Sequence, residues 1–220
     1  IHECGHSFTG LLDEYSLSPT GFGLPPGFGD TGINLTDRTD LETCPWRHWI
    51  EAGEPGIGFH EGGAGRTKGL WHPSSRGCIM GTSTAFHCAV CREAIVLEIY
   101  RRVRPVDRAE PDPATPIQLV RGSTKDVVLR VVVLKPATHA IDVEWTVDGI
   151  KPSAKDIRTD AFQDPRTREW VVETTLPAHL FIGRGSRVVT ATVVDRTPWV
   201  KLDKDKRLRQ EVKWTVESAD

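Results

Sequence analysis

Apolar and polar residues alternate over short runs in the second half of the chain. Five such runs are rich in β-branched residues and are separated by turn residues: Asp126 to Leu134, Ile141 to Asp148, Glu169 to Leu176, Arg187 to Asp195 and Glu211 to Glu217. A period of two places one face of each strand in a core and the other in solvent. The pattern predicts an antiparallel, Ig-like β-sandwich over residues 117–220, with Trp145 and Trp214 inside it.

The first half of the chain predicts two helices and long loops. Ala89 to Val103 repeats apolar residues at steps of three and four, which is typical of a helix, and Cys44 to Ala52 predicts a shorter one. Residues 16–43 and 53–77 are rich in glycine and polar residues and predict long loops, which in an enzyme would wall the substrate cleft. Residues 105–116 contain four prolines and predict a semi-rigid linker.

Composition excludes two classes of partner. The formal net charge of the 220 residues is −2, so the chain has neither the basic footprint of a nucleic-acid-binding protein nor a polybasic membrane patch. Its apolar runs are all shorter than a membrane span requires. We therefore expect no nucleic-acid partner and no membrane span, and the composition leaves the oligomeric state open.

The most specific chemistry lies in the first fifteen residues, IHECGHSFTGLLDEY. His2 and His6 are four residues apart, so a helix places both imidazoles on one face, where they can bind one metal ion. Glu3 follows the first histidine, where its carboxylate can accept a proton from a water held by that ion. Two surface histidines at a helix start would have the same spacing, so the HExxH pattern alone leaves both interpretations open.

The residues after this pattern favour the metal site. Gly10 is placed to end the helix in a left-handed turn, which glycine enters without steric cost. Metzincin peptidases have a third zinc ligand three residues after the corresponding glycine. The same step from Gly10 reaches Asp13, which we predict as the third ligand, with Glu14 as the alternative.

Met80 is the one methionine, and it lies in the turn-like sequence GCIMG of residues 77–81. Metzincins have a Met-turn, whose methionine lies beneath the metal. A methionine that fills a gap in a core is the alternative. The position between two glycines, downstream of the HExxH pattern, favours the Met-turn.

All five cysteines lie within the first 91 residues. Cys44, Cys78, Cys88 and Cys91 could form two disulfides, a four-cysteine zinc site or, at the CxxC pair, a redox centre. We expect disulfides, because they are common in secreted peptidases. Cys4 lies off the face of the two histidines, and we expect it to be a small buried residue.

Together these motifs resemble those of the IgA-peptidase-like zinc metallopeptidases of bacteria. The signature of that family is similar to HExGHSFxGLxDEY, which residues 2–15 follow. Its later pattern resembles four further segments of this chain: EGG at 61–63, LWHP at 70–73, CIM at 78–80 and FHCAVCREAI at 86–95. His72 and His87 depart from the family pattern.

The resemblance implies a secreted or cell-envelope zinc endopeptidase that acts on a protein or peptide substrate. Zn²⁺ would be held by His2, His6 and Asp13, with Glu3 as the catalytic base. The predicted fold class is α+β: the helical and loop part of a metzincin-like catalytic domain over 1–104, the linker over 105–116, and the sandwich over 117–220.

The alternative function is an inactive relative or fragment whose sandwich binds a cell-envelope or host glycan or protein. In such a protein the metal site would be purely structural and would need ligands but no base. The presence of Glu3 therefore argues against this alternative. Metzincin-like domains have a twisted sheet before the metal-binding helix, and we expect no strands between Ile1 and Val103 that could replace it. We therefore expect the chain to lack an upstream part and to have little peptidase activity alone.

Overall fold

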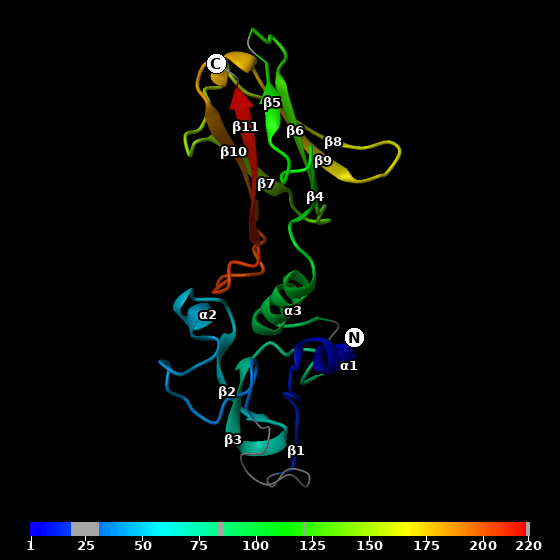
Figure 1. Ribbon diagram of the computed structural model, residues 1–220. Helices are drawn as coiled ribbons and strands as arrows, with labels where there is room; N and C mark the ends of the chain where they lie inside the picture. Colours follow the sequence, from blue (N-terminus) through cyan, green and yellow to red (C-terminus); the bar gives the residue numbers. More distant parts are fainter. Residues whose placement is uncertain (19–30, 83–85, 121, 219–220) are drawn as a thin grey trace. The chain divides into compact units, whose positions relative to one another are not determined.

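The fold is that of a computed structural model, which describes residues 1–18, 31–82, 86–120 and 122–218 (Figure 1). The chain divides into two compact units. Unit 1 comprises Ile1–Ile99 and Pro198–Lys204, and unit 2 comprises Tyr100–Thr197 and Asp205–Asp220. Each unit has its own cluster of buried apolar side chains.

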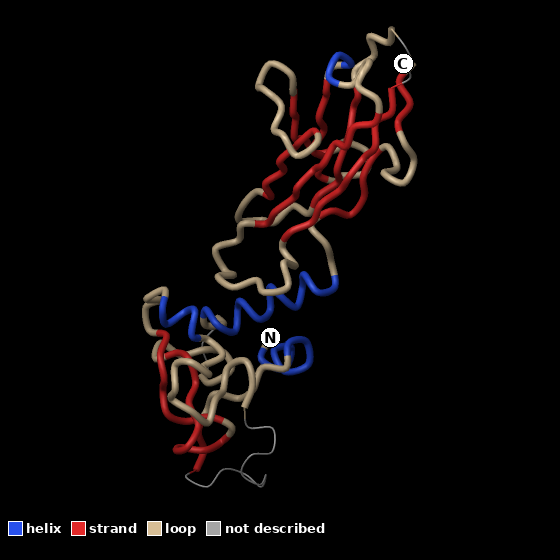
Figure 2. Tube along the Cα trace, turned by 60° about the vertical axis from the view of Figure 1, so that its left-hand side comes forward, coloured by secondary structure: helices blue, strands red, loops and turns tan. Residues whose placement is uncertain are grey.

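Strands predominate in the described residues (Figure 2). Three sheets contain three, four and four strands. The α-helices are α1 (His2–Cys4), α2 (Arg47–Glu51) and α3 (Ala89–Arg102), and only α3 exceeds five residues. The predicted α+β fold class, with a helical and loop N-terminal part, is therefore wrong, because the chain is mostly β-structure.

Unit 1 contains a sheet that the sequence did not predict. Its order is β1 (Ser16–Ser18), β3 (Gly65–Ser74), β2 (Ile57–Gly63), with β1 parallel to β3 and β2 antiparallel to it. Two predictions are thus wrong, the loop over 53–77 and the lack of strands before Val103. The expectation that the chain alone has little peptidase activity was based on that lack of strands, so it loses its ground. Residues 19–30, in the middle of the predicted loop 16–43, lie outside the described residues.

Glycine explains why the pattern of apolar and polar residues did not predict this sheet. Glycine is depleted in strands and usually marks loops, but here it permits close approach of other segments to a tight hairpin. Gly62 and Gly63 have φ of 126° and 139°, and a Cβ on either would lie 2.4 Å from a side-chain atom, of Ser16 and Leu35 respectively. The glycine-rich run is therefore the hairpin itself.

The two predicted helices are confirmed. α3 agrees with the predicted helix to within one residue, and α2 lies inside the predicted range with Trp49 buried against the core of unit 1. None of the helices in the described part of the chain is both long and apolar enough to cross a membrane.

One buried carboxylate joins three segments of unit 1. Glu93 on α3 is 5% exposed. Its Oε2 accepts hydrogen bonds from His48 Nε2 (2.5 Å) and Trp49 Nε1 (2.7 Å) on α2. Its Oε1 accepts from the backbone N–H groups of Lys201 (2.7 Å) and Leu202 (3.1 Å). These bonds explain why residues 198–204 belong to unit 1, although they follow a strand of unit 2.

Unit 2 is a β-sandwich of two four-stranded sheets. One sheet has the order β5 (Ile117–Leu119), β11 (Arg209–Ser218), β10 (Ser186–Asp195), β7 (Ile141–Val147). The other has the order β4 (Val106–Glu110), β6 (Val127–Val133), β9 (Trp170–Leu176), β8 (Arg158–Gln163). The five predicted strands are confirmed as β6, β7, β9, β10 and β11. Their pairings are antiparallel, and β5 adds a parallel pairing with β11.

The three strands that the pattern missed are all at the edges of the sheets. β8 is exposed along its whole length, so it has no apolar face to produce an alternation. β4 lies within residues 105–116, which were predicted as a linker, and it pairs with β6 from Val106↔Val133 to Glu110↔Arg130. That part of the linker prediction is wrong. Prolines at either end of β4 are compatible with an edge strand, which need not donate every backbone N–H.

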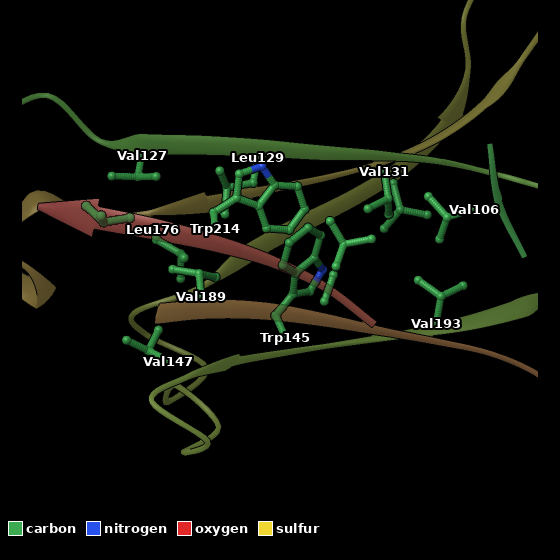
Figure 3. Close-up of a cluster of buried hydrophobic side chains, with 14 of the residues drawn as sticks. Val106, Val127, Leu129, Val131, Trp145, Val147, Leu176, Val189, Val193 and Trp214 are labelled. Atoms are coloured by element: carbon green, nitrogen blue, oxygen red, sulfur yellow. The ribbon is translucent and has the colours of Figure 1, made fainter. Parts of the chain in front are cut away.

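The core of the sandwich contains the two predicted tryptophans. Trp145 is 3% and Trp214 is 0% exposed, and their rings stack with centroids 5.7 Å apart. Figure 3 shows both rings between side chains of β6 and side chains of β7 and β10. Trp214 Nε1 also donates a hydrogen bond to the carbonyl of Pro111 (2.7 Å), so the indole N–H is satisfied inside the core.

The register of β10 can be tested with two neighbouring valines. Val189 is fully buried and Val188 is 37% exposed. We expect Val189→Ala to lower the free energy of unfolding in urea by about 1–3 kcal/mol, because it leaves a cavity. The same change at Val188 should alter it by less than about 0.5 kcal/mol. The reverse order would mean that β10 is shifted by one residue.

Candidate metal centre

The HExxH segment forms a short helix that ends where the sequence predicted. α1 continues as a π-helical turn, η1 (Gly5–Thr9), and Gly10 follows with φ 70° and ψ 24°. The N–H groups of Gly10 and Leu11 donate to the carbonyls of His6 (2.9 Å) and Gly5 (3.1 Å). The predicted left-handed turn at Gly10 is confirmed, and it sends the chain back past the two histidines.

This reversal brings three side chains together. His2 Nε2 lies 3.0 Å and His6 Nε2 lies 3.1 Å from Asp13 Oδ1, and the two Nε2 atoms are 3.1 Å apart. Ligand atoms around a tetrahedral zinc with bonds of 2.0–2.1 Å are about 3.3 Å apart. The three donor atoms therefore have nearly the spacing of one face of a zinc coordination sphere.

Hydrogen bonds fix the tautomer of both imidazoles. His2 Nδ1 lies 2.7 Å from the carbonyl oxygen of Ile79, and His6 Nδ1 lies 2.6 Å from that of Leu11. A carbonyl only accepts, so each Nδ1 carries a hydrogen, and each Nε2 is directed toward the other ring and toward Asp13. Asp13 Oδ1 is buried, and its neighbours among the described residues at hydrogen-bond distance are these two Nε2 atoms. A cation at this point would satisfy all three atoms, so the donor set fits a metal ion.

The carboxylates around the site favour a positive charge there. The pKa of His2 is raised, chiefly by its hydrogen bond to the carbonyl of Ile79 and also by the carboxylates of Asp13 and Glu3, while burial lowers it. The pKa of Tyr15 is raised, first because its hydroxyl donates to Asp13. Glu3 is exposed, and the charge of its carboxylate contributes to both shifts.

The structure separates the two candidates for the third ligand. Asp13 faces the histidines, whereas Glu14 is 4% exposed and accepts a hydrogen bond from Asn34 Nδ2 (2.9 Å). Burial raises the pKa of Glu14 to about 7. The Tyr15 hydroxyl donates to the Asp13 carboxylate.

Asn34 is a site residue that the sequence analysis missed. It is fully buried, and its side chain accepts from the N–H of Leu12 (2.8 Å) and donates to the carbonyl of Leu12 (2.8 Å) and to Glu14. It thus holds the backbone of Leu12 and the side chain of Glu14, the two residues that flank Asp13. The sequence carries no signal of this role, because Asn34 lies more than twenty residues away within a segment that resembles a loop.

Met80 lies against the metal-site helix. It is fully buried, and a Cβ placed on Gly5 would lie 2.7 Å from its sulfur, so a larger residue at that point of the helix would displace the Met80 side chain. The carbonyl of Met80 accepts from the N–H of Glu14 (2.8 Å). The turn that contains Met80 and Ile79 therefore contacts both the helix and the segment that carries Asp13.

The cysteines differ from their prediction. All five belong to the described part of the chain and are free thiols, so the expected disulfides are not supported. Cys4 is exposed, and the expectation that it is buried is wrong. Cys78, Cys88 and Cys91 lie together with Glu14. The neighbouring thiols of Cys88 and Cys91 hold the pKa of Cys78 well below the usual range.

Comparison with known proteins adds little to this geometry. No protein-family model matches the sequence, and no curated protein matches it. A solved structure described as "Crystal Structure of Rst D1-D2" is similar with a TM-score of 0.34 and 13% identity over 52% of this chain. The match covers 50% of that chain, so the present sequence corresponds to about half of its length. A similarity at this level carries no argument about function.

Removal of the third donor should weaken metal binding. We expect Asp13→Ala to lower the zinc affinity by on the order of 100-fold or more, measured by competition with a chromophoric chelator, because two neutral imidazoles alone remain. Asp13→Asn should lose less, since it keeps one oxygen donor. The control is Asp37→Ala, an exposed aspartate. Equal affinities of Asp13→Ala and the control would refute the assignment.

Removal of Asn34 should also weaken zinc binding, although its side chain does not face the histidines. Asn34→Ala leaves the polar groups of Leu12 and Glu14 without their partner and frees the segment around Asp13. Loss of such a supporting residue lowers metal affinity by about 10- to 100-fold. Gln118→Ala, at an exposed position in the sandwich, is the control. An unchanged affinity in a folded Asn34→Ala chain would show that the segment is held without this side chain.

Proposed function

We propose that this chain is a zinc-dependent endopeptidase. The observation that carries the proposal is the convergence of His2 Nε2, His6 Nε2 and Asp13 Oδ1 within 3.1 Å of one another, on a segment in which Glu3 directly follows the first histidine. The resemblance of the motifs to the IgA-peptidase-like family supports the same reading, together with a protein or peptide substrate and a secreted or cell-envelope location.

The exposure of the site favours catalysis over a structural role. Structural zinc sites are closed and have four protein ligands, whereas catalytic sites keep one position open. Among the described residues, this site groups three donors, His2, His6 and Asp13. Their side chains are 29%, 30% and 27% exposed. Water and a substrate carbonyl can therefore reach the point that the three donors share.

The residues of the chain would divide the chemistry between them. Zn²⁺ at the three donors supplies Lewis-acid polarisation of an attacking water and of the substrate carbonyl. Glu3 accepts the proton of that water at its carboxylate as the new C–O bond forms, and returns it to the amine nitrogen as the C–N bond breaks. Tyr15 acts through Asp13, because its hydroxyl donates to that carboxylate and keeps it directed at the histidines.

The test separates the base from the metal. We expect Glu3→Gln to retain zinc and to lower casein cleavage by about 100- to 10,000-fold, since the amide cannot accept the proton. Glu144→Gln, an exposed position in the sandwich, should cleave as the unmodified chain does. Zinc content and cleavage are measured on the same samples.

Two results would contradict this function. Cleavage by Glu3→Gln at the unmodified rate would remove Glu3 from the mechanism. A fully zinc-loaded, folded chain that cleaves neither casein nor gelatin would leave the centre with a structural role.

A further inference from the structure

A second group of potential metal ligands lies in unit 1, in addition to the proposed catalytic centre. One donor atom from each of Glu14, Cys78, Cys88 and Cys91 lies within 4.8 Å of every other. The four side chains are 4%, 1%, 6% and 0% exposed. This cluster, which we call the Cys₃Glu cluster, is therefore closed to solvent, unlike the histidine site.

Three separate segments contribute to the Cys₃Glu cluster. Glu14 directly follows Asp13, and Cys78 begins the turn that contains Met80. Cys88 and Cys91 lie at the start of α3, where a step of three residues brings two side chains to one side of a helix. Cys91 Sγ is 3.2 Å from Glu14 Oε1, and the N–H of Cys88 donates to Cys78 Sγ (3.3 Å).

The chemistry of the Cys₃Glu cluster differs from that of an apolar core or a disulfide. A buried carboxylate is costly unless it is paired or binds a metal, and the partners of Glu14 here include a neutral amide and a thiol. A disulfide would use two of the three sulfurs and leave the third thiol beside the carboxylate. Three sulfurs and one oxygen make a complete tetrahedral set for a thiophilic ion, and a backbone N–H to a ligand sulfur is typical support for one.

We propose that Glu14, Cys78, Cys88 and Cys91 bind a second Zn²⁺ with a structural role, independent of the proposed catalytic zinc. Such an ion would join the start of α3 to the two segments that flank the histidine site. Glu14 adjoins the ligand Asp13, and Cys78 adjoins Ile79, whose carbonyl orients His2. The second ion would therefore hold in place the backbone on which the first site depends.

The zinc content of variants in which one of the two sites is altered tests this proposal. By plasma mass spectrometry, the full chain purified with zinc should contain two zinc ions, and His6→Ala should contain one. Cys88→Ser/Cys91→Ser should also lose one, while Cys4→Ser, an exposed thiol outside the cluster, should keep both. A His6→Ala chain without zinc would overturn the proposal. So would an intact-chain mass that is lower by two hydrogens in the absence of reductant than in its presence, because this difference indicates a disulfide.

Cobalt gives a second measurement that does not depend on the folding of cysteine variants. His6→Ala retains all three cysteines of the cluster and lacks one ligand of the histidine site. When this chain is loaded with Co²⁺, we expect an intense near-ultraviolet band from thiolate-to-cobalt charge transfer. Bound Co²⁺ without that band would show that the cysteines are not ligands. Because the variant disables the histidine site, the result is independent of whether the chain is a peptidase.

Discussion

The structure of unit 1 depends on one electrostatic constraint, the meeting of three electron-pair donors within 3.1 Å. Two neutral imidazoles and a carboxylate oxygen repel one another at this distance unless a cation or a proton lies between them. Their positions are nevertheless determined from outside, because the carbonyls of Ile79 and Leu11 hold the far side of each ring. The folded backbone thus holds the three donors together, and a metal ion bound between them would relieve their repulsion.

The rest of unit 1 can be understood as support for the segment that carries Asp13. The carbonyl of Asp13 accepts a hydrogen bond from the N–H of Ala64, at the β2–β3 turn. The carbonyl of Tyr15 accepts one from the N–H of Gly65. The Asn34 side chain bonds the backbone of Leu12, before Asp13, and the carbonyl of Met80 accepts from the N–H of Glu14, after it. The hairpin, the Asn34 segment and the Met80 turn are distant in sequence, yet each donates or accepts at this short stretch of backbone. A ligand held on several sides has little freedom to relax away from the metal, which favours a preorganised site.

The sequence predicted the parts of this arrangement that have a short period or a fixed spacing. The HExxH step, the left-handed Gly10 and the alternating strands around Trp145 and Trp214 all depend on neighbours within a few residues. The missed features depend on tertiary contacts instead. Asn34 acts through residues more than twenty positions away, Gly62 and Gly63 are required by what packs against them, and β8 has no buried face to reveal it. The α+β prediction failed for the same reason, since glycine-rich strands were taken as loops.

The central claim is that His2, His6 and Asp13 share one metal ion. Anomalous diffraction at the zinc absorption edge, from crystals of the chain grown with zinc, tests it most directly. The account predicts an anomalous peak bounded by the two Nε2 atoms and Asp13 Oδ1, at about 2.0–2.2 Å from each. Zinc-soaked crystals without a peak at this point, in which the three side chains point apart, would contradict it.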